Sequence, residues 1–92
     1  MLFDWDEAKS ERTLHERGFD FEFVAHVFDR ETEEFVDTRK DYGEVRIIAF
    51  GRIEAELYGV VYTQRGDIRW IISAFRCRHR ELERWKRRAA EG

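Results

Sequence analysis

The sequence predicts an α+β protein with the element order β-α-α-β-β-β-β-α, in which helices pack on an antiparallel sheet. Residues 6–28 have the capping residues and apolar spacing of two helices, whereas residues 33–75 alternate short apolar runs with turn segments. A basic segment at residues 82–89 again has helical spacing. The chain has 92 residues, no proline and no Gly/Ser-rich linker, so we expect a single domain over residues 1–92.

The first part of the chain predicts a short strand followed by a helix. Leu2–Asp4 is the candidate strand. The helix should begin after Asp6, whose carboxylate can accept from the first free amides, and should run to about Arg17. Gly18 can adopt the left-handed conformation that ends a helix. The apolar face of this helix is small, so we expect it to lie on the surface.

A second helix is predicted by its cap and its spacing. Asp20 is the expected N-cap, with Phe19 and Val24 placed to contact each other across the helix start. Phe21, Val24 and Phe28 recur on one helical face. The two helices should therefore form an αα-hairpin.

Four strands should follow, and the last two form the clearest hairpin because Gly66 can supply the positive φ of a tight turn. Residues 37–43 read as a charged loop. Strict alternation in the last strand would place Ile71 and Ala74 on opposite faces. The final helix should dock on the sheet through Leu82, Trp85 and Ala89. The expected strands are Glu33–Val36, Val45–Phe50, Leu57–Thr63 and Ile68–Phe75.

Composition limits the classes of protein to which the chain can belong. One cysteine excludes an internal disulfide, and no apolar run approaches the roughly 20 residues needed to span a bilayer. We therefore expect a cytoplasmic protein without membrane contact. Residues 65–88 contain nine Lys/Arg and three acids, whereas residues 1–64 contain eight Lys/Arg and sixteen acids. This basic end suits a polyanion or an acidic partner.

A metal site is not predicted. Cys77 and His79 are spaced unlike the ligands of common zinc sites, and the chain has no second Cys/His pair. His79 lies between two arginines whose charges would favour a neutral imidazole, able to accept a proton near pH 7. It can equally be one more residue of a solvated basic helix.

Three arginines form a candidate phosphate cradle, defined here as Arg46, Arg65 and Arg76 on one concave face of the sheet. Guanidinium groups stay charged and match the geometry of phosphate oxygens. The alternative for each of these arginines is an exposed side chain that serves only to keep the protein soluble. Glu44, two residues from Arg46 on the same strand face, could act as a base or orient that arginine, or it could form an ordinary cross-strand ion pair.

The motifs of this sequence resemble those of a known family, the BrnT toxins of bacterial type II toxin–antitoxin modules. These toxins are relatives of the RelE-like ribonucleases. The likeness rests on FDWDEAKSERTLHERGFDFEFVAHVFD at residues 3–29 and on Gly-Glu-Val-Arg at 43–46 followed by Gly51. It also rests on VVYTQRGDIRWIISA at residues 60–74 and the arginine-rich segment after it. The order and spacing of these motifs together are specific.

The resemblance implies a RelE-like fold and a metal-independent endoribonuclease that cuts RNA through the ribose 2′-hydroxyl and inhibits translation, with no cofactor. With the candidate residues above, the leading hypothesis has Arg46, Arg65 and Arg76 as ligands of the phosphate and the transition state, and Glu44 or His79 as the catalytic proton-transfer residue. Arg69, Arg78 and Arg80 would bind RNA. The resemblance also implies a BrnA-like ribbon-helix-helix antitoxin as partner, with DNA contacted only indirectly through that antitoxin.

Two departures from the family pattern favour an alternative, an attenuated toxin homologue that binds the antitoxin without catalysis. Phe75 stands where the family usually has arginine, and Arg76 follows it by one residue. Trp85 replaces a usual tyrosine and cannot supply a phenol proton.

Overall fold

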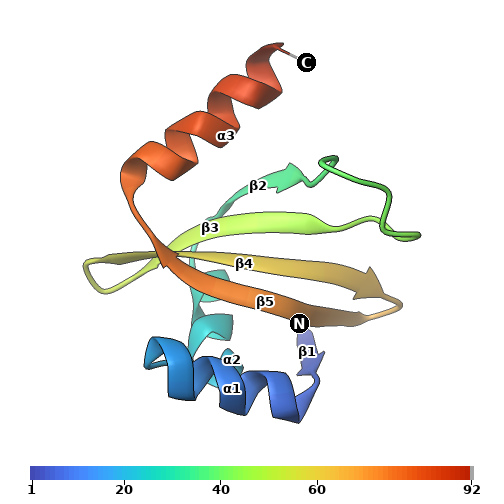
Figure 1. Ribbon diagram of the computed structural model, residues 1–92, viewed down its shortest axis with the longest axis vertical. Helices are drawn as coiled ribbons and strands as arrows, with labels where there is room; N and C mark the ends of the chain where they lie inside the picture. The colour runs from blue at the N-terminus through green and yellow to red at the C-terminus, as the bar shows by residue number, and fades with distance from the viewer. Residues whose placement is uncertain (92) are drawn as a thin grey trace.

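The computed structural model describes residues 1–91 and has the predicted order of elements (Figure 1). The second predicted helix is a single α-turn that continues as a 3-10 helix. The third strand begins at Ile47 rather than Val45, so Arg46 precedes the strand and does not lie inside it. The elements are β1 (Leu2–Trp5), α1 (Glu7–Arg17), α2 (Phe21–Val24), η1 (Ala25–Asp29), β2 (Glu33–Val36), β3 (Ile47–Ile53), β4 (Glu56–Arg65), β5 (Ile68–Cys77) and α3 (His79–Glu91).

The five strands form one sheet in the order β1-β5-β4-β3-β2. Strands β2 to β5 are an antiparallel meander, as predicted. β1 pairs in parallel with β5, so the sheet is mixed and the expectation of a purely antiparallel sheet was wrong. The reason is that the chain leaves β1 through the αα-hairpin and crosses to the opposite edge, where the meander begins and runs back toward β1.

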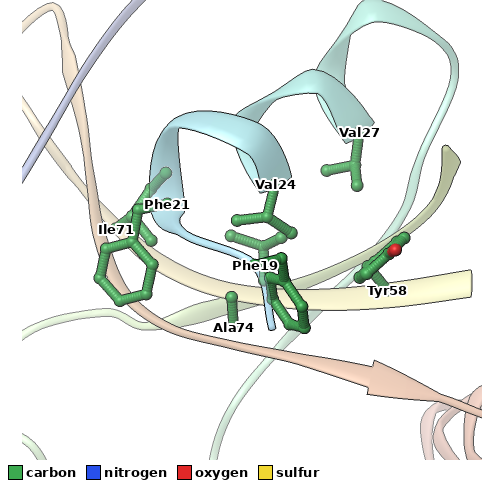
Figure 2. Packing of buried hydrophobic residues seen from close by; sticks show 8 residues of the cluster. Phe19, Phe21, Val24, Val27, Tyr58, Ile71 and Ala74 are labelled. Atoms are coloured by element: carbon green, nitrogen blue, oxygen red, sulfur yellow. The ribbon is translucent and has the colours of Figure 1, made fainter. Parts of the chain in front are cut away.

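The helices cover the two faces of the sheet. α1, α2 and η1 lie on one face, and α3 rises over the other from the end of β5 (Figure 1). Under α2 and η1, a buried apolar cluster joins these helices to β4 and β5 (Figure 2). A second cluster under α3 is formed by Ile48, Phe50, Leu57, Val61, Cys77 and Leu82, with Phe35, Ile72, Phe75 and Trp85 packed against it.

The caps of the helices are as predicted from the sequence. The Asp6 carboxylate accepts hydrogen bonds from the first free amides of α1, and Gly18 ends that helix with φ of +87°. The Asp20 carboxylate accepts from the amide of Phe23. One link was not predicted: the buried Ser10 hydroxyl accepts from the amide of Phe21 at 3.0 Å and fixes α2 on α1.

A bulge interrupts the pairing of β4 with β5. Val61 pairs with Ser73 and Tyr62 pairs with Ile71, which leaves Ile72 without a partner. A residue inserted in this way shifts every later side chain of its strand to the other face. The predicted strict alternation along β5 was therefore wrong.

The bulge determines on which face of the sheet the last side chains of β5 lie. Ile71 and Ala74 lie in the same cluster, under α2, although alternation placed them on opposite faces. Arg76 pairs with Tyr58 of that cluster and its guanidinium lies 5.8 Å from the centre of the Tyr58 ring. Arg76 therefore faces the α1–α2 side of the sheet and not the side covered by α3.

Within residues 1–91 no helix combines the length and apolarity needed to cross a membrane. Cys77 is free and buried, and its burial, together with the charge of Glu81, raises the pKa of the thiol to about 11. No group of three or more His, Cys, Asp or Glu in this part of the chain is arranged to hold a metal ion.

Candidate functional site

The structure distributes the predicted site residues over three separate places. In the β4–β5 ladder Arg65 pairs with Ile68 at one end and Tyr58 pairs with Arg76 at the other. The seven steps from residue 58 to residue 65 correspond to roughly 23 Å of strand. The cradle predicted from the sequence is therefore divided. Glu44, Arg46 and Arg65 lie near the turn of the hairpin, Arg69 lies on the face of the sheet under η1, and Arg76, Arg78, His79 and Arg80 lie at the far end of β5 and the start of α3.

The group near the turn is called the loop–hairpin site, and it consists of Tyr42, Glu44, Arg46, Arg65 and Trp70. The Arg65 guanidinium lies over the Trp70 ring, 4.7 Å from its centre, and its Nη2 is 3.6 Å from Oε1 of Glu44. Stacking and the ion pair together fix the direction of an otherwise mobile side chain. The loop that carries Glu44 is attached to β4, because the Thr63 hydroxyl donates to the carbonyl of Val45 at 2.8 Å.

The second guanidinium of the site is held in the same way. The Arg46 guanidinium lies 4.1 Å from the centre of the Tyr42 ring, and Nζ of Lys40 lies 5.3 Å from that centre. Nε of Arg46 is buried and has no hydrogen-bond partner within residues 1–91. A buried donor without a partner is unfavourable, so the position of Arg46 has a cost that the stacking on Tyr42 must offset.

Asp37 anchors the loop, and the sequence analysis missed it. Its side chain is 2% exposed and accepts from the amide, Nε and Nη2 of Arg39 and from the Tyr42 hydroxyl. The hydrogen bonds from Arg39, more than the other contacts, lower the pKa of the Asp37 carboxyl to about 2. The Asp-x-Arg spacing was the signal available in the sequence, but it was read only as part of a charged loop.

Trp85 connects this loop to α3. The guanidinium groups of Arg39 and Arg88 lie 5.2 Å and 4.7 Å from the centre of its ring, and the Phe35 ring lies 6.1 Å away. Two positive charges are thereby gathered around one aromatic ring. Basic and aromatic side chains therefore continue from the loop–hairpin site to the end of α3.

Arg69 is engaged in a network on the other face of the sheet. Its guanidinium lies 4.7 Å from the centres of the Phe28 and Tyr62 rings, and its Nη1 is 3.8 Å from the Glu34 carboxylate. Tyr62 and Thr32 each donate a hydroxyl to the same carboxylate. Burial, reinforced by Glu34, raises the pKa of the Tyr62 phenol to about 12. Arg69 is only 19% exposed, which leaves little of it for an RNA contact.

The third group of predicted site residues lies at the start of α3. Nε2 of His79 lies 2.9 Å from the Glu83 carboxylate, one helical turn further on, so the imidazole contacts an acid and not the neighbouring arginines. Arg78 and Arg80 are exposed. Because His79 and Glu44 lie at opposite ends of the hairpin, one phosphate cannot contact both.

A model of the family described as "Ribonuclease toxin, BrnT, of type II toxin-antitoxin system" matches residues 5–81. The chain belongs to the BrnT family. The match includes the loop–hairpin site and ends within the first turn of α3, so Trp85 and Arg88 lie outside it. A comparison with curated proteins gave no match. The resemblance recognised in the sequence is confirmed, and with it membership of a family of type II toxin–antitoxin ribonucleases.

The structure explains one departure from the BrnT pattern. The Phe75 ring lies against Gly59, so closely that a Cβ at Gly59 would be 2.6 Å from Cζ of that ring. The ring also packs against the cluster under α3. Arg76, the next residue, points to the opposite face and does not bring a positive charge to the place of Phe75.

Proposed function

We propose that this BrnT-family chain is a metal-independent endoribonuclease toxin that cuts RNA through the ribose 2′-hydroxyl and so inhibits translation. The observation that carries the proposal is the loop–hairpin site. There, two guanidinium groups from different segments are held on aromatic rings, and one of them, that of Arg65, lies 3.6 Å from the Glu44 carboxylate. The pair of positive charges suits a phosphodiester, and the carboxylate suits proton removal.

The proposed step uses side chains of the loop–hairpin site, with water as the acid. Glu44 takes the proton of the 2′-hydroxyl, and the resulting oxygen forms a bond to the adjacent phosphorus while the bond to the 5′-oxygen breaks. Arg46 and Arg65 neutralise the negative charge that develops on the non-bridging oxygens. Water protonates the leaving 5′-oxygen. The products are a 2′,3′-cyclic phosphate and a 5′-hydroxyl.

The remaining predicted residues take different places in this proposal. The exposed Arg78 and Arg80 bind the RNA backbone beyond the cleavage site. Arg76 and His79 lie at the far end of the hairpin, so we assign them no part in the step at Glu44. Arg69 supports the sheet through its network with Glu34.

The alternative function is an attenuated toxin homologue that binds its antitoxin without cutting RNA. The apolar packing of Phe75 favours it, because the family's usual arginine at that position would add a positive charge on the side of the sheet covered by α3. For either function we propose a cytoplasmic protein with a BrnA-like ribbon-helix-helix antitoxin, and contact with DNA only through that antitoxin.

Cleavage of RNA should survive EDTA, because the proposed step uses no metal. The measurement incubates the purified chain with naked RNA, with and without EDTA, and identifies the new ends as cyclic phosphates. Loss of cleavage in EDTA and its recovery on adding a divalent ion would contradict metal independence. Intact RNA under all conditions, together with normal antitoxin binding, would support the attenuated alternative.

Arg65→Ala and Arg76→Ala distinguish the loop–hairpin site from the cradle predicted from the sequence. Arg65→Ala should slow cleavage by at least about tenfold, since a lost charge-assisted contact of about 1.4 kcal/mol has that effect. Arg76→Ala should slow it less, because Arg76 faces the other side of the sheet. Single-turnover rates and circular dichroism provide the test. Equal losses in two folded variants would show that the RNA engages both ends of the hairpin.

A further inference from the structure

β2 is an edge strand whose outer side has hydrogen-bonding groups without a strand partner. The amide of Asp37 donates to the carbonyl of Arg46, so this directly opposed pair is a hydrogen-bonded pair of the antiparallel ladder. Such pairs alternate along a strand. Phe35 therefore bonds inward to β3, whereas the N–H and C=O groups of Glu34 and Val36 point outward.

A groove lies along this outer edge, between β2 and the second half of α3. Its volume is about 430 Å³, and Val36 is 53% exposed beside it. β2 is the last strand of the sheet, and α3 rises past it (Figure 1). The groove is lined by Glu34, Phe35, Val36, Thr38, Trp85, Arg88 and Ala89.

The charges of the groove favour a negatively charged occupant. Arg88 has no carboxylate within 4 Å among residues 1–91 and rests on Trp85 together with Arg39. The acids of β2 are already neutralised or hydrogen-bonded: Nζ of Lys86 is 3.1 Å from Glu33, and Glu34 accepts from two hydroxyls. A second copy that paired its own β2 with this one would bring a second Arg88 to the same edge, so it fits less well than an acidic segment.

We propose that an extended segment of the antitoxin adds to β2 as a sixth strand and places apolar and acidic side chains in this groove. The backbone of the segment would pair with Glu34 and Val36, and a carboxylate would meet Arg88. Its end would lie beside Thr38, where the loop that carries Tyr42 and Arg46 begins. The segment would therefore restrict access to the loop–hairpin site. The identity of the partner, but not the groove, rests on the proposed function.

Amide hydrogen exchange, followed by NMR, tests the pairing in the unmodified protein. The chain is compared alone and in complex with the antitoxin encoded by the adjacent reading frame. The amides of Glu34 and Val36 should exchange at least tenfold more slowly in the complex, whereas the amide of Asp37, already bonded to Arg46, provides the internal reference. A complex in which these two amides stay unprotected would overturn this inference alone. Failure to form any complex would overturn the antitoxin assignment in the proposed function as well.

Val36→Pro tests the same pairing by removing one outward donor. Proline is tolerated in an edge strand where its missing N–H would face solvent, and the inward bonds of Phe35 and Asp37 stay. The variant should bind the antitoxin at least tenfold more weakly, whereas Val36→Thr, which keeps the donor and the β-branch, should bind within about threefold of wild type. Equal binding by all three proteins would overturn the proposal. Protection of the Glu34 and Val36 amides that appears without antitoxin and increases with the concentration of the chain would also overturn it, because it would indicate that a second copy pairs with β2.

Discussion

Glu44→Gln should slow RNA cleavage by at least about 100-fold and leave RNA binding as tight as in the wild type, or tighter. Glutamine has the shape of glutamate and keeps an oxygen at the place of the carboxylate, but it cannot take the proton of the 2′-hydroxyl. A positioned general base typically contributes a factor of 10²–10⁴ in rate. Single-turnover rates measure the chemical step, and fluorescence anisotropy measures the affinity for the same RNA.

Glu56→Gln is the matched control for this variant. Glu56 is an exposed residue at the opposite end of β4 from Arg65, so the same change there should leave both rate and affinity within about threefold of wild type. If Glu44→Gln cleaved as fast as this control, the carboxylate would serve only to orient Arg65. The base would then lie elsewhere, and the step proposed at the loop–hairpin site would be wrong.

Features set by neighbouring residues in the chain could be predicted from the sequence. The caps at Asp6 and Asp20 and the helix end at Gly18 depend on residues within one helical turn, and all three are as predicted. The β4–β5 hairpin likewise depends on Gly66, whose φ is +60°. The bounds of β2, Glu33–Val36, also agree with the prediction, since Phe35 and Val36 are apolar residues within a charged stretch of the sequence.

Features set by distant residues could not be predicted in this way. The bulge at Ile72 is a feature of the pairing between β4 and β5, which no local pattern in β5 alone describes. It reverses the face of Arg76 and thereby divides the predicted cradle. The parallel pairing of β1 was missed for a similar reason, because a four-residue strand does not indicate which edge it joins.

The charged residues of the candidate site could be predicted from the sequence, but the aromatic residues that hold them in position could not. Glu44, Arg46 and Arg65 were predicted as site residues, and the structure pairs Glu44 with Arg65 and leaves Arg46 two residues from Glu44 in the same loop. No role was predicted for the two aromatic residues of the site. Tyr42 and Trp70 lie against guanidinium groups, each at a distance typical of a cation–π contact. The direction of each arginine therefore depends on a ring whose role is visible only in three dimensions.

Tyr42, on whose ring the Arg46 guanidinium lies, donates its hydroxyl to Asp37. Asp37→Asn should therefore lower both the stability of the fold and the rate of RNA cleavage. Asparagine keeps the size of the side chain but removes the charge that accepts three hydrogen bonds from Arg39 and one from Tyr42. A hydrogen bond to a charged group contributes roughly 1.5–3 kcal/mol, so we expect a loss of about 2 kcal/mol in the free energy of unfolding. The Tyr42 ring would lose its anchor, and RNA cleavage should fall by about tenfold.

The Asp37 carboxyl should make the free energy of unfolding depend on pH. Its pKa is about 2 in the folded chain, below the ordinary value of 3.8, so its contribution is complete above about pH 4 and is lost as the pH falls toward 2. Urea unfolding at several pH values between 6 and 2.5 should show the gap between wild type and Asp37→Asn narrowing in this range. Asp41→Asn is the matched control, since Asp41 is exposed in the same loop and its oxygen accepts only from the amide of Gly43. A gap that stays constant with pH, or an equal loss in Asp41→Asn, would show that the Asp37–Arg39 pair does not hold the loop.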